Sequence, residues 1–272
     1  MTSIIKAHAY GNDFLLVRAS VLPANADRAA IARALCERHR GIGADGVLIF
    51  EPTPAGATCD LLNADGSPSE LSGNGVRCLA AWLAEERGLP PGAALNIGTG
   101  AGAKRLSLLD RDGRTFRFRA AMGPPEGVRE ERLHVSGGDV TAVVMRVGNP
   151  QCVVLGAATP ERLHTIAAGL AVHAFFPEGT NVELVDVEAP DRIRILIWER
   201  GVGPTEASGT GACASAVAAA AFGGASRDVS VVSPGGTQRV EWTPETIFLT
   251  GTATIVGRIS PDGLAGLDGR HA

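Results

Sequence analysis

A short motif occurs twice in this chain, and its second copy starts half the chain length after the first. The first copy reads Glu70-Leu-Ser72-Gly-Asn-Gly and the second reads Glu206-Ala-Ser208-Gly-Thr-Gly. The two serines are 208 − 72 = 136 residues apart, which is half of the 272 residues. A motif that recurs at this spacing predicts a duplicated domain. Two equivalent halves could present two equivalent groups to one ligand between them.

Each copy of the motif also predicts the start of a helix. Residues that favour helix formation follow the glycines, over residues 76–83 in the first copy and 212–221 in the second. A serine at a helix start can cap free backbone N–H groups, and the glycines allow a ligand to approach the backbone. Because a helix N-terminus carries exposed donors and partial positive charge, each copy is a candidate site for a carboxylate or a phosphate. Two plain helix caps are the alternative, and the half-chain spacing weighs against it.

Composition narrows the class of protein. Hydrophobic residues make up 45% of the chain and charged residues 20%, which is enough apolar side chain for a packed core. The net charge is −4, and no block of Lys or Arg indicates a nucleic-acid surface. The first residues do not form a signal peptide, and no apolar run reaches transmembrane length. We therefore expect a soluble, cytoplasmic protein that binds neither nucleic acid nor membranes.

The remaining motifs of common cofactor and metal sites are weak. The five cysteines are an odd number and contain no C-x-x-C pair, so neither a disulfide framework nor a zinc site is indicated. Residues 209–214 superficially match a dinucleotide-binding fingerprint. Such a fingerprint directly follows a strand, whereas residues 201–207 intervene here. We expect no metal and no nucleotide cofactor.

The pattern of apolar residues predicts an α+β chain. Helices are predicted over residues 28–39, from the first Ser-Gly-Asn-Gly to about 87, over 160–171, and from the second motif to about 222. Strands are predicted over residues 4–7, 15–18, 47–51, 59–63, 94–97, 105–109, 115–120, 140–147, 153–155, 181–187, 193–198, 229–232, 237–242, 247–250 and 252–259. This order is not the regular strand–helix alternation of a doubly wound sheet.

These elements divide into two halves, residues 1–120 and 121–251. A stretch rich in Pro, Gly and charge, residues 121–132, is predicted to be a linker, and the tail from Ser260 is predicted to be mobile. Gly11-Asn12-Asp13 interrupts a strand pattern, which indicates either a hairpin turn or an asparagine directed at a ligand.

Seven short motifs, in one order and spread over nearly the whole chain, closely resemble those of the diaminopimelate epimerase family. They are Gly11-Asn-Asp-Phe14, Asn63-Ala-Asp-Gly-Ser67, Ser72-Gly-Asn-Gly-Val-Arg77, Gly148-Asn-Pro150, Thr180-Asn181, Glu199-Arg-Gly201 and Ser208-Gly-Thr-Gly-Ala-Cys213. The resemblance implies an α+β fold of two pseudo-symmetric domains, each a mostly antiparallel curved sheet or barrel around a central helix. It also implies that a C-terminal strand within 252–272 returns to the first domain, and that the protein is a homodimer.

The resemblance assigns roles to individual positions. Members of this family are pyridoxal-independent amino-acid racemases and epimerases, so no cofactor is implied, and the partner is a small amino-acid substrate. Ser72 and Ser208 occupy the catalytic positions. The other implied roles are binding roles: the distal end of the substrate at Asn12, Asn63, Asn149 and Asn181, charge-assisted contacts at Glu199 and Arg200, and backbone N–H groups for the reacting carboxylate at Gly73, Asn74, Gly209 and Thr210.

Four positions depart from the family pattern. The family has Cys directly before each Gly-x-Gly, where a thiolate removes the α-proton from one face and a thiol returns a proton on the other; this chain has Ser72 and Ser208. Cys78 and Cys213 do not replace them, because the family has cysteines there as well. The other departures are Gln151, where the family usually has His, and Gly46, where Gln is common.

The sequence thus predicts an epimerase that interconverts LL- and meso-2,6-diaminoheptanedioate, impaired by the two serines. A hydroxyl is far less acidic than a thiol and needs an adjacent base, for which Glu199 is the nearest candidate. Two alternatives stay open: a divergent relative, such as a 3-hydroxyproline dehydratase or another amino-acid racemase, and a non-catalytic amino-acid-binding protein. Exchange of the α-proton in heavy water separates the three.

Overall fold

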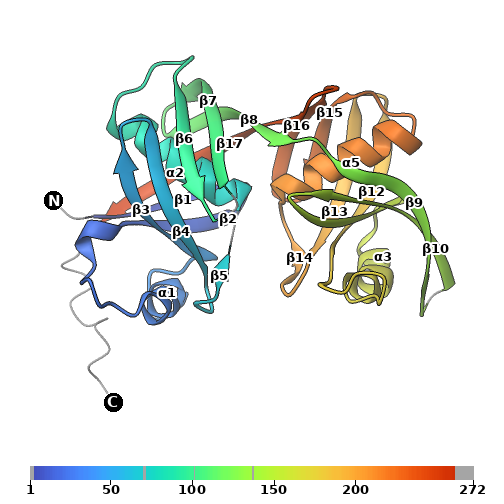
Figure 1. Cartoon of the computed structure of the whole chain (residues 1–272), viewed down its shortest axis with the longest axis horizontal. Coiled ribbons are helices and arrows are strands. Elements are labelled where there is room, and N and C mark those ends of the chain that lie inside the picture. The colour runs from blue at the N-terminus through green and yellow to red at the C-terminus, as the bar shows by residue number, and fades with distance from the viewer. Residues whose placement is uncertain (1–2, 70–71, 101, 137, 261–272) are drawn as a thin grey trace. The chain divides into compact units, whose positions relative to one another are not determined.

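The computed structural model describes residues 3–69, 72–100, 102–136 and 138–260. The chain forms two compact units, Met1–Arg119 together with Thr252–Ala272, and Ala120–Gly251. It passes from the first unit to the second within strand β8 (Thr115–Gly123) and returns within strand β17 (Ile247–Ile259) (Figure 1). The second unit is therefore a continuous segment inserted into the first.

The first unit is built from strands packed around helix α2 (Gly73–Glu86). The strands β1 and β2 form an antiparallel hairpin, β2 runs parallel to β3, β3 is antiparallel to β4, and β4 runs parallel to β6. The other elements of this unit are η1 (Ala19–Val21) and α1 (Arg28–Cys36). The strands are β1 (Ile4–Ala9), β2 (Asn12–Arg18), β3 (Gly46–Thr53), β4 (Gly56–Asn63), β5 (Pro68–Ser69), β6 (Ala94–Thr99) and β7 (Gly102–Asp112).

The second unit repeats this order of pairings around helix α5 (Gly209–Phe222). The hairpin is β10–β11, β11 runs parallel to β12, β12 is antiparallel to β13, and β13 runs parallel to β15. Its helical connection contains α3 (Pro160–Arg162), a π-helical turn (Leu163–Ala167) and α4 (Ala168–Ala171). The strands are β9 (Glu126–Val135), β10 (Gly138–Val147), β11 (Asn149–Leu155), β12 (Asn181–Ala189), β13 (Arg192–Glu199), β14 (Gly203–Thr205), β15 (Asp228–Ser233) and β16 (Gly236–Trp242). The predicted fold class, two pseudo-symmetric α+β domains with a central helix in each, is confirmed.

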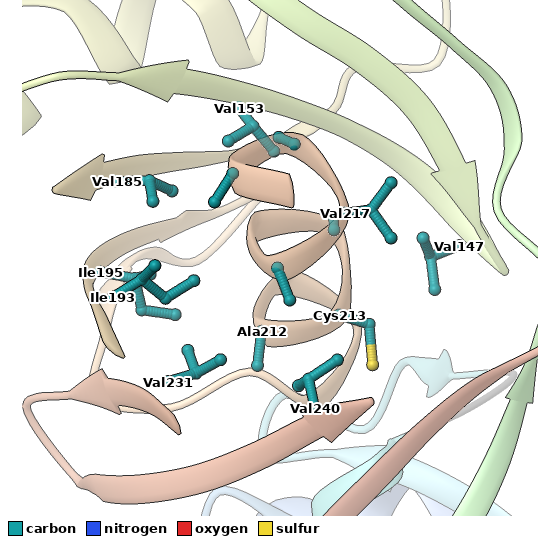
Figure 2. Close-up of a cluster of buried hydrophobic side chains, with 14 of the residues drawn as sticks. Val147, Val153, Val185, Ile193, Ile195, Ala212, Cys213, Val217, Val231 and Val240 are labelled. Atoms are coloured by element: carbon teal, nitrogen blue, oxygen red, sulfur yellow. The ribbon is translucent and has the colours of Figure 1, made fainter. Parts of the chain in front are cut away.

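Helix α5 is enclosed because its sequence has no polar face. Its residues are buried without a break from Gly211 to Ala219, more than two helical turns, so every side of the helix is covered. Valines and isoleucines of the surrounding strands supply that cover, and Figure 2 shows Val185, Ile193 and Ile195 directed at the helix. The alanines keep the helix narrow enough to be surrounded.

Two sequence-based predictions of the connections are wrong. Residues 121–132 are not a linker, because β8 extends to Gly123 and β9 occupies most of the remainder, paired with β10. One face of β9 carries exposed charges while Leu133 and Val135 are buried, so its composition resembles that of a loop. The strands predicted over 247–250 and 252–259 form one continuous strand, β17.

Two further predictions need smaller corrections. Helix α1 ends at Cys36 and not at residue 39, because Glu37 adopts a non-helical ψ of 122°. Its carboxylate then accepts hydrogen bonds from the backbone N–H groups of His39 and Arg40. Glu70, the first residue of one motif copy, and the tail beyond residue 260 lie outside the described residues.

We expect Ile195→Ala to destabilise the second unit by about 2–5 kcal/mol, because it removes apolar volume from the wall around α5. Urea unfolding followed by tryptophan fluorescence measures this, since Trp198 and Trp242 belong to the same unit. The matched control is Val202→Ala, whose side chain is 72% exposed and whose effect should stay within about 0.5 kcal/mol. Equal losses in both variants would contradict the packing argument.

Candidate functional site

The two serines of the repeated motif each cap a central helix. Ser72 has extended backbone (φ −127°, ψ 117°), and its Oγ accepts a hydrogen bond of 3.1 Å from the N–H of Gly75. Ser208 has nearly the same conformation (φ −133°, ψ 129°), and its Oγ accepts a bond of 3.2 Å from the N–H of Gly211. The predicted N-caps are therefore confirmed, and the two positions are local equivalents.

Both helix starts have the electrostatic character of an anion site. Neither α2 nor α5 has an acidic residue in its first turn, so nothing in that turn offsets the partial positive charge of the helix N-terminus. At α5, a Cβ on Gly211 would lie 2.5 Å from Oε1 of Glu183, so only glycine allows the strand residue to approach this closely.

In the first unit, hydrogen bonds join Asn12 to the start of α2. The Asn12 amide donates to Oδ2 of Asp45 at 2.9 Å, and the Asn74 amide donates to Oδ1 of Asn12 at 3.4 Å. The guanidinium of Arg77, which is buried, donates to Oδ1 of Asn74 and lies 5.6 Å from the centre of the Tyr10 ring. Two of the predicted binding residues, Asn12 and Asn74, are thus held together beside Ser72 and Gly73.

Sequence reasoning did not single out Asp45, although it positions Asn12. Its carboxylate accepts from the Asn12 amide and from the backbone N–H of Asp13, and it forms an ion pair with Arg38 at 2.7 Å. Burial tends to raise the pKa of Asp13, but hydrogen bonds from Arg38 and Lys6 hold it below its usual value. The available signal was only a Gly-Ala-Asp-Gly turn, which many surface loops share.

Asn63 lies at the exposed end of β4, where it pairs with Gly46 of β3. Its amide donates to the Ser67 hydroxyl at 2.9 Å. A Cβ at Gly46 would lie 2.8 Å from the carbonyl oxygen of Leu62. Thus any side chain at this position, including the Gln that the resemblance leads us to expect, would require the neighbouring backbone to shift.

In the second unit, strand alternation gathers polar side chains at one end of the core around α5. Val153, Val185 and Ile197 pack on α5, whereas Cys152, Val182 and Leu184 belong to a cluster on the other side of the sheet. Because side chains alternate along a strand, residues two or four positions away from the first group share its face. These are Gln151, Glu183, Asn181 and Glu199.

Short contacts connect this polar group to Ser208. The Gln151 amide nitrogen lies 2.6 Å from Oδ1 of Asn149 and 3.2 Å from Oγ1 of Thr210, which is 3.5 Å from Oγ of Ser208. The Gln151 amide oxygen lies 3.0 and 3.2 Å from the two oxygens of Glu183. Three residues predicted for the site, Asn149, Thr210 and Ser208, are thereby brought together.

Glu183 is the second residue that sequence reasoning did not single out. Its side chain is fully buried, like that of Gln151. Burial, with a contribution from the nearby Glu199 carboxylate, raises the pKa of Glu183 well above its usual value. A signal was present: an acidic residue flanked by apolar residues on both sides in Val182-Glu183-Leu184 of a predicted strand.

Asn181 and Arg200 lie close together. Oδ1 of Asn181, which is 8% exposed, accepts a hydrogen bond of 2.9 Å from the backbone N–H of Arg200. The Arg200 guanidinium is exposed and donates to the carbonyl oxygen of Glu178. Asn181 therefore fixes the backbone at the end of β13, from which Glu199 and Arg200 project.

The cysteines are unsuited to act as bases. All five cysteines are outside disulfide bonds and buried. Burial raises the pKa of the Cys78 thiol to about 12, and burial raises the pKa of the Cys152 thiol as well. Because the thiolate is the reactive form, these positions do not replace Ser72 and Ser208.

Metal-binding clusters and membrane-spanning helices are both absent from the described residues. Among residues 3–69, 72–100, 102–136 and 138–260, no group of three or more His, Cys, Asp and Glu side chains is arranged to hold a metal ion. Within the same ranges, none of the helices has the length and apolar character needed to span a membrane.

The sequence matches one family model and many relatives. Residues 4–128 and 143–256 match the family model for diaminopimelate epimerase. The diaminopimelate epimerase of Moorella thermoacetica is 36% identical over 271 residues, which cover 93% of this chain and 97% of the relative. That of Desulforudis audaxviator is 38% identical over 264 residues, which cover 91% and 95%.

Solved structures share the fold at lower identity. A hydroxyproline epimerase from Agrobacterium vitis, with bound trans-4-hydroxy-L-proline, has a TM-score of 0.72 at 17% identity and covers 100% of this chain and 94% of its own. A predicted epimerase from Pseudomonas aeruginosa has a TM-score of 0.75 at 16% identity, with 96% and 99% covered. Since the family model spans most of the chain and relatives more than 30% identical span over nine-tenths of it, the chain belongs to the diaminopimelate epimerase family.

Proposed function

We propose that this chain is an isomerase that interconverts LL- and meso-2,6-diaminoheptanedioate, by removing and returning an α-proton without a cofactor. The observation that carries the proposal is the pair of equivalent serine-capped helix starts, at the positions where the family has its two catalytic cysteines. The reaction is a step of lysine biosynthesis. We also propose that the enzyme works in the cytoplasm as a homodimer, as the family resemblance implies.

The helix starts supply the binding half of this chemistry. The reacting carboxylate of the substrate would be bound by backbone N–H groups of Gly73 and Asn74 on α2 and of Gly209 and Thr210 on α5. Partial positive charge at a helix N-terminus favours such an anion. It also stabilises the negative charge that develops when the α-proton leaves.

The distal amino acid group of the substrate would be bound by polar side chains. Asn12, Asn63, Asn149 and Asn181 offer amide donors and acceptors, and Glu199 and Arg200 match an ammonium and a carboxylate by charge. The hydrogen bonds already made by Asn12 and Asn181 support this role, because they fix the side chains before the substrate binds.

The two groups that would transfer the proton are weaker acids in this chain than the thiols they replace. In the mechanism that the family resemblance implies, one of two residues removes the α-proton and the other returns one, and this chain has Ser72 and Ser208 at those positions. A thiol has a pKa near 8.5 that a helix N-terminus lowers, whereas a serine hydroxyl must be deprotonated by a neighbour. A pocket that binds the amino acid without turnover is therefore the second candidate function, and the two serines favour it.

We expect the double variant Ser72→Cys, Ser208→Cys to raise kcat by roughly 10²–10⁴-fold while KM changes little. A positioned acid or base contributes about this much to the rate, and cysteine keeps nearly the shape of serine. The measurement is α-proton exchange and inversion of LL-diaminopimelate in heavy water, followed by NMR.

The single variants are the matched controls. Because an acid and a base that act together are not additive, each single change should recover much less than the double change. An unmodified protein whose rate the double variant does not improve would identify the serines themselves as the catalysts. Glu199 would then be the first residue to test as their base.

We expect diaminopimelate to bind about 10- to 150-fold more tightly than alanine, which lacks the distal group. Losing a hydrogen bond to a charged group costs about 1.5–3 kcal/mol, and that cost converts into this range of Kd. Calorimetric titration of both amino acids measures the ratio. Comparable affinities would mean that the distal end is not recognised by polar groups.

A further inference from the structure

A buried carboxyl group lies behind the start of α5 and has no part in the chemistry described so far. Glu183 is on β12, between Val153 of β11 and Ile197 of β13 in the sheet register. Its side chain is fully buried, and its Oε1 lies close to the backbone of Gly211 in the first turn of α5. The N–H of that same residue donates to Ser208.

The contacts of Gln151 indicate whether the Glu183 carboxyl group is protonated. The amide oxygen of Gln151 lies 3.0 and 3.2 Å from the Glu183 oxygens, and its amide nitrogen lies 2.6 Å from Oδ1 of Asn149. A carboxylate and an amide oxygen are both acceptors, so these distances require a proton between them. A neutral Glu183 supplies it by donating to Gln151.

Reversing the Gln151 amide is the alternative, and it creates a new conflict. The reversed NH₂ group could donate to an ionised Glu183, but the amide oxygen would then lie 2.6 Å from Oδ1 of Asn149, a second acceptor. Asn149 would have to reverse as well. A neutral Glu183 satisfies all three groups without reversing either amide, so this arrangement needs the fewest changes.

The surroundings of Glu183 point in the same direction. The titratable groups that act on it or respond to it are Glu199 on β13 and Cys152 on β11. Neither is a cation, and an ionised carboxyl group that is fully buried needs a charged partner or several donors. Burial raises the pKa of Glu183 well above its usual value, in agreement with the contacts.

We propose that Glu183 is a positioning residue: as a neutral acid, it orients Gln151 and through it Thr210 and Ser208. Because it is neutral, it also places no negative charge beside the carboxylate site at the start of α5. The chain of donors runs from the Glu183 hydroxyl to the Gln151 oxygen, from the Gln151 nitrogen to Thr210, and from the Thr210 hydroxyl to Ser208. The inference rests on the proposed function where it concerns the substrate, but its protonation state can be tested without any ligand.

The ligand-free test is the pH dependence of stability. Glu183 has a raised pKa in the folded state, so between its unfolded and folded pKa the native chain holds a proton that the unfolded chain has lost. The contribution of Glu183 to the free energy of unfolding is fully present below about pH 4.5 and is lost as the pH rises through its pKa in the folded state. Glu183→Gln is neutral at every pH, so the urea midpoint should fall less with rising pH in this variant. The control Glu245→Gln changes an exposed acid of the same unit and should leave the profile unchanged.

The ligand test is the pH dependence of diaminopimelate binding. Ionisation of Glu183 would repel the substrate carboxylate, so Kd in the unmodified protein should increase as the pH rises through the raised pKa of Glu183, and the increase should be smaller in Glu183→Gln. In the double-cysteine background, Glu183→Leu should lower kcat about tenfold with little change in KM, because the Gln151 oxygen loses its donor. Glu183→Gln, which can still donate to that oxygen, should restore most of the loss.

Each outcome supports or overturns a stated part of the inference. Identical stability profiles for the unmodified protein and Glu183→Gln would show that Glu183 is ionised and would overturn it. Equal kcat in the leucine and glutamine variants would overturn the positioning role, even if both variants fold. Failure to bind diaminopimelate at every pH would overturn the proposed function and the part that concerns the substrate, whereas the stability profiles would still decide the protonation of Glu183.

Discussion

The structure of the second unit depends on burying α5, a helix that is apolar on all sides, and the first unit likewise buries most of α2, including its Arg77. Burial from Gly211 to Ala219 stabilises α5, but it also removes water from the first backbone N–H groups of the helix. Ser208 satisfies one of them, as Ser72 does in α2. The remaining donors make the start of the helix polar and positively charged, although it lies inside an apolar unit. The same requirement that shapes the core thus generates the positively charged helix start that we propose as the carboxylate site.

The strands around α5 place polar side chains beside the polar start of the helix. Along β11, β12 and β13, the residues facing α5 are valine and isoleucine beside the helix body, and glutamine, asparagine and glutamate beside its start. The polar residues are satisfied mainly by one another, as the contacts of Gln151 show. A buried polar group of this kind is costly when it is incomplete, so its members constrain one another.

Sequence reasoning predicted the fold class, the central helices and the N-caps because each rests on local chemistry or on a repeat: serine before Gly-x-Gly, alanine runs, and the half-chain spacing. It failed where tertiary pairing overrides composition, as in β9, whose charged face resembles a linker. It also did not single out Glu183 and Asp45. Their importance comes from neighbours on other strands and turns, such as Gln151 for Glu183 and Asn12 for Asp45, and no spacing along the chain reveals such contacts.

The return of β17 to the first unit makes that unit discontinuous in sequence. Ile4 of β1 pairs with Ile259 of β17, so one edge of the first sheet is completed by a strand that is synthesised more than two hundred residues later. The second unit, Ala120–Gly251, has no such dependence. During synthesis from the N-terminus, the inserted unit can therefore finish its sheet first, while the unit containing the start of the chain waits for the last strand with the edge of β1 unpaired.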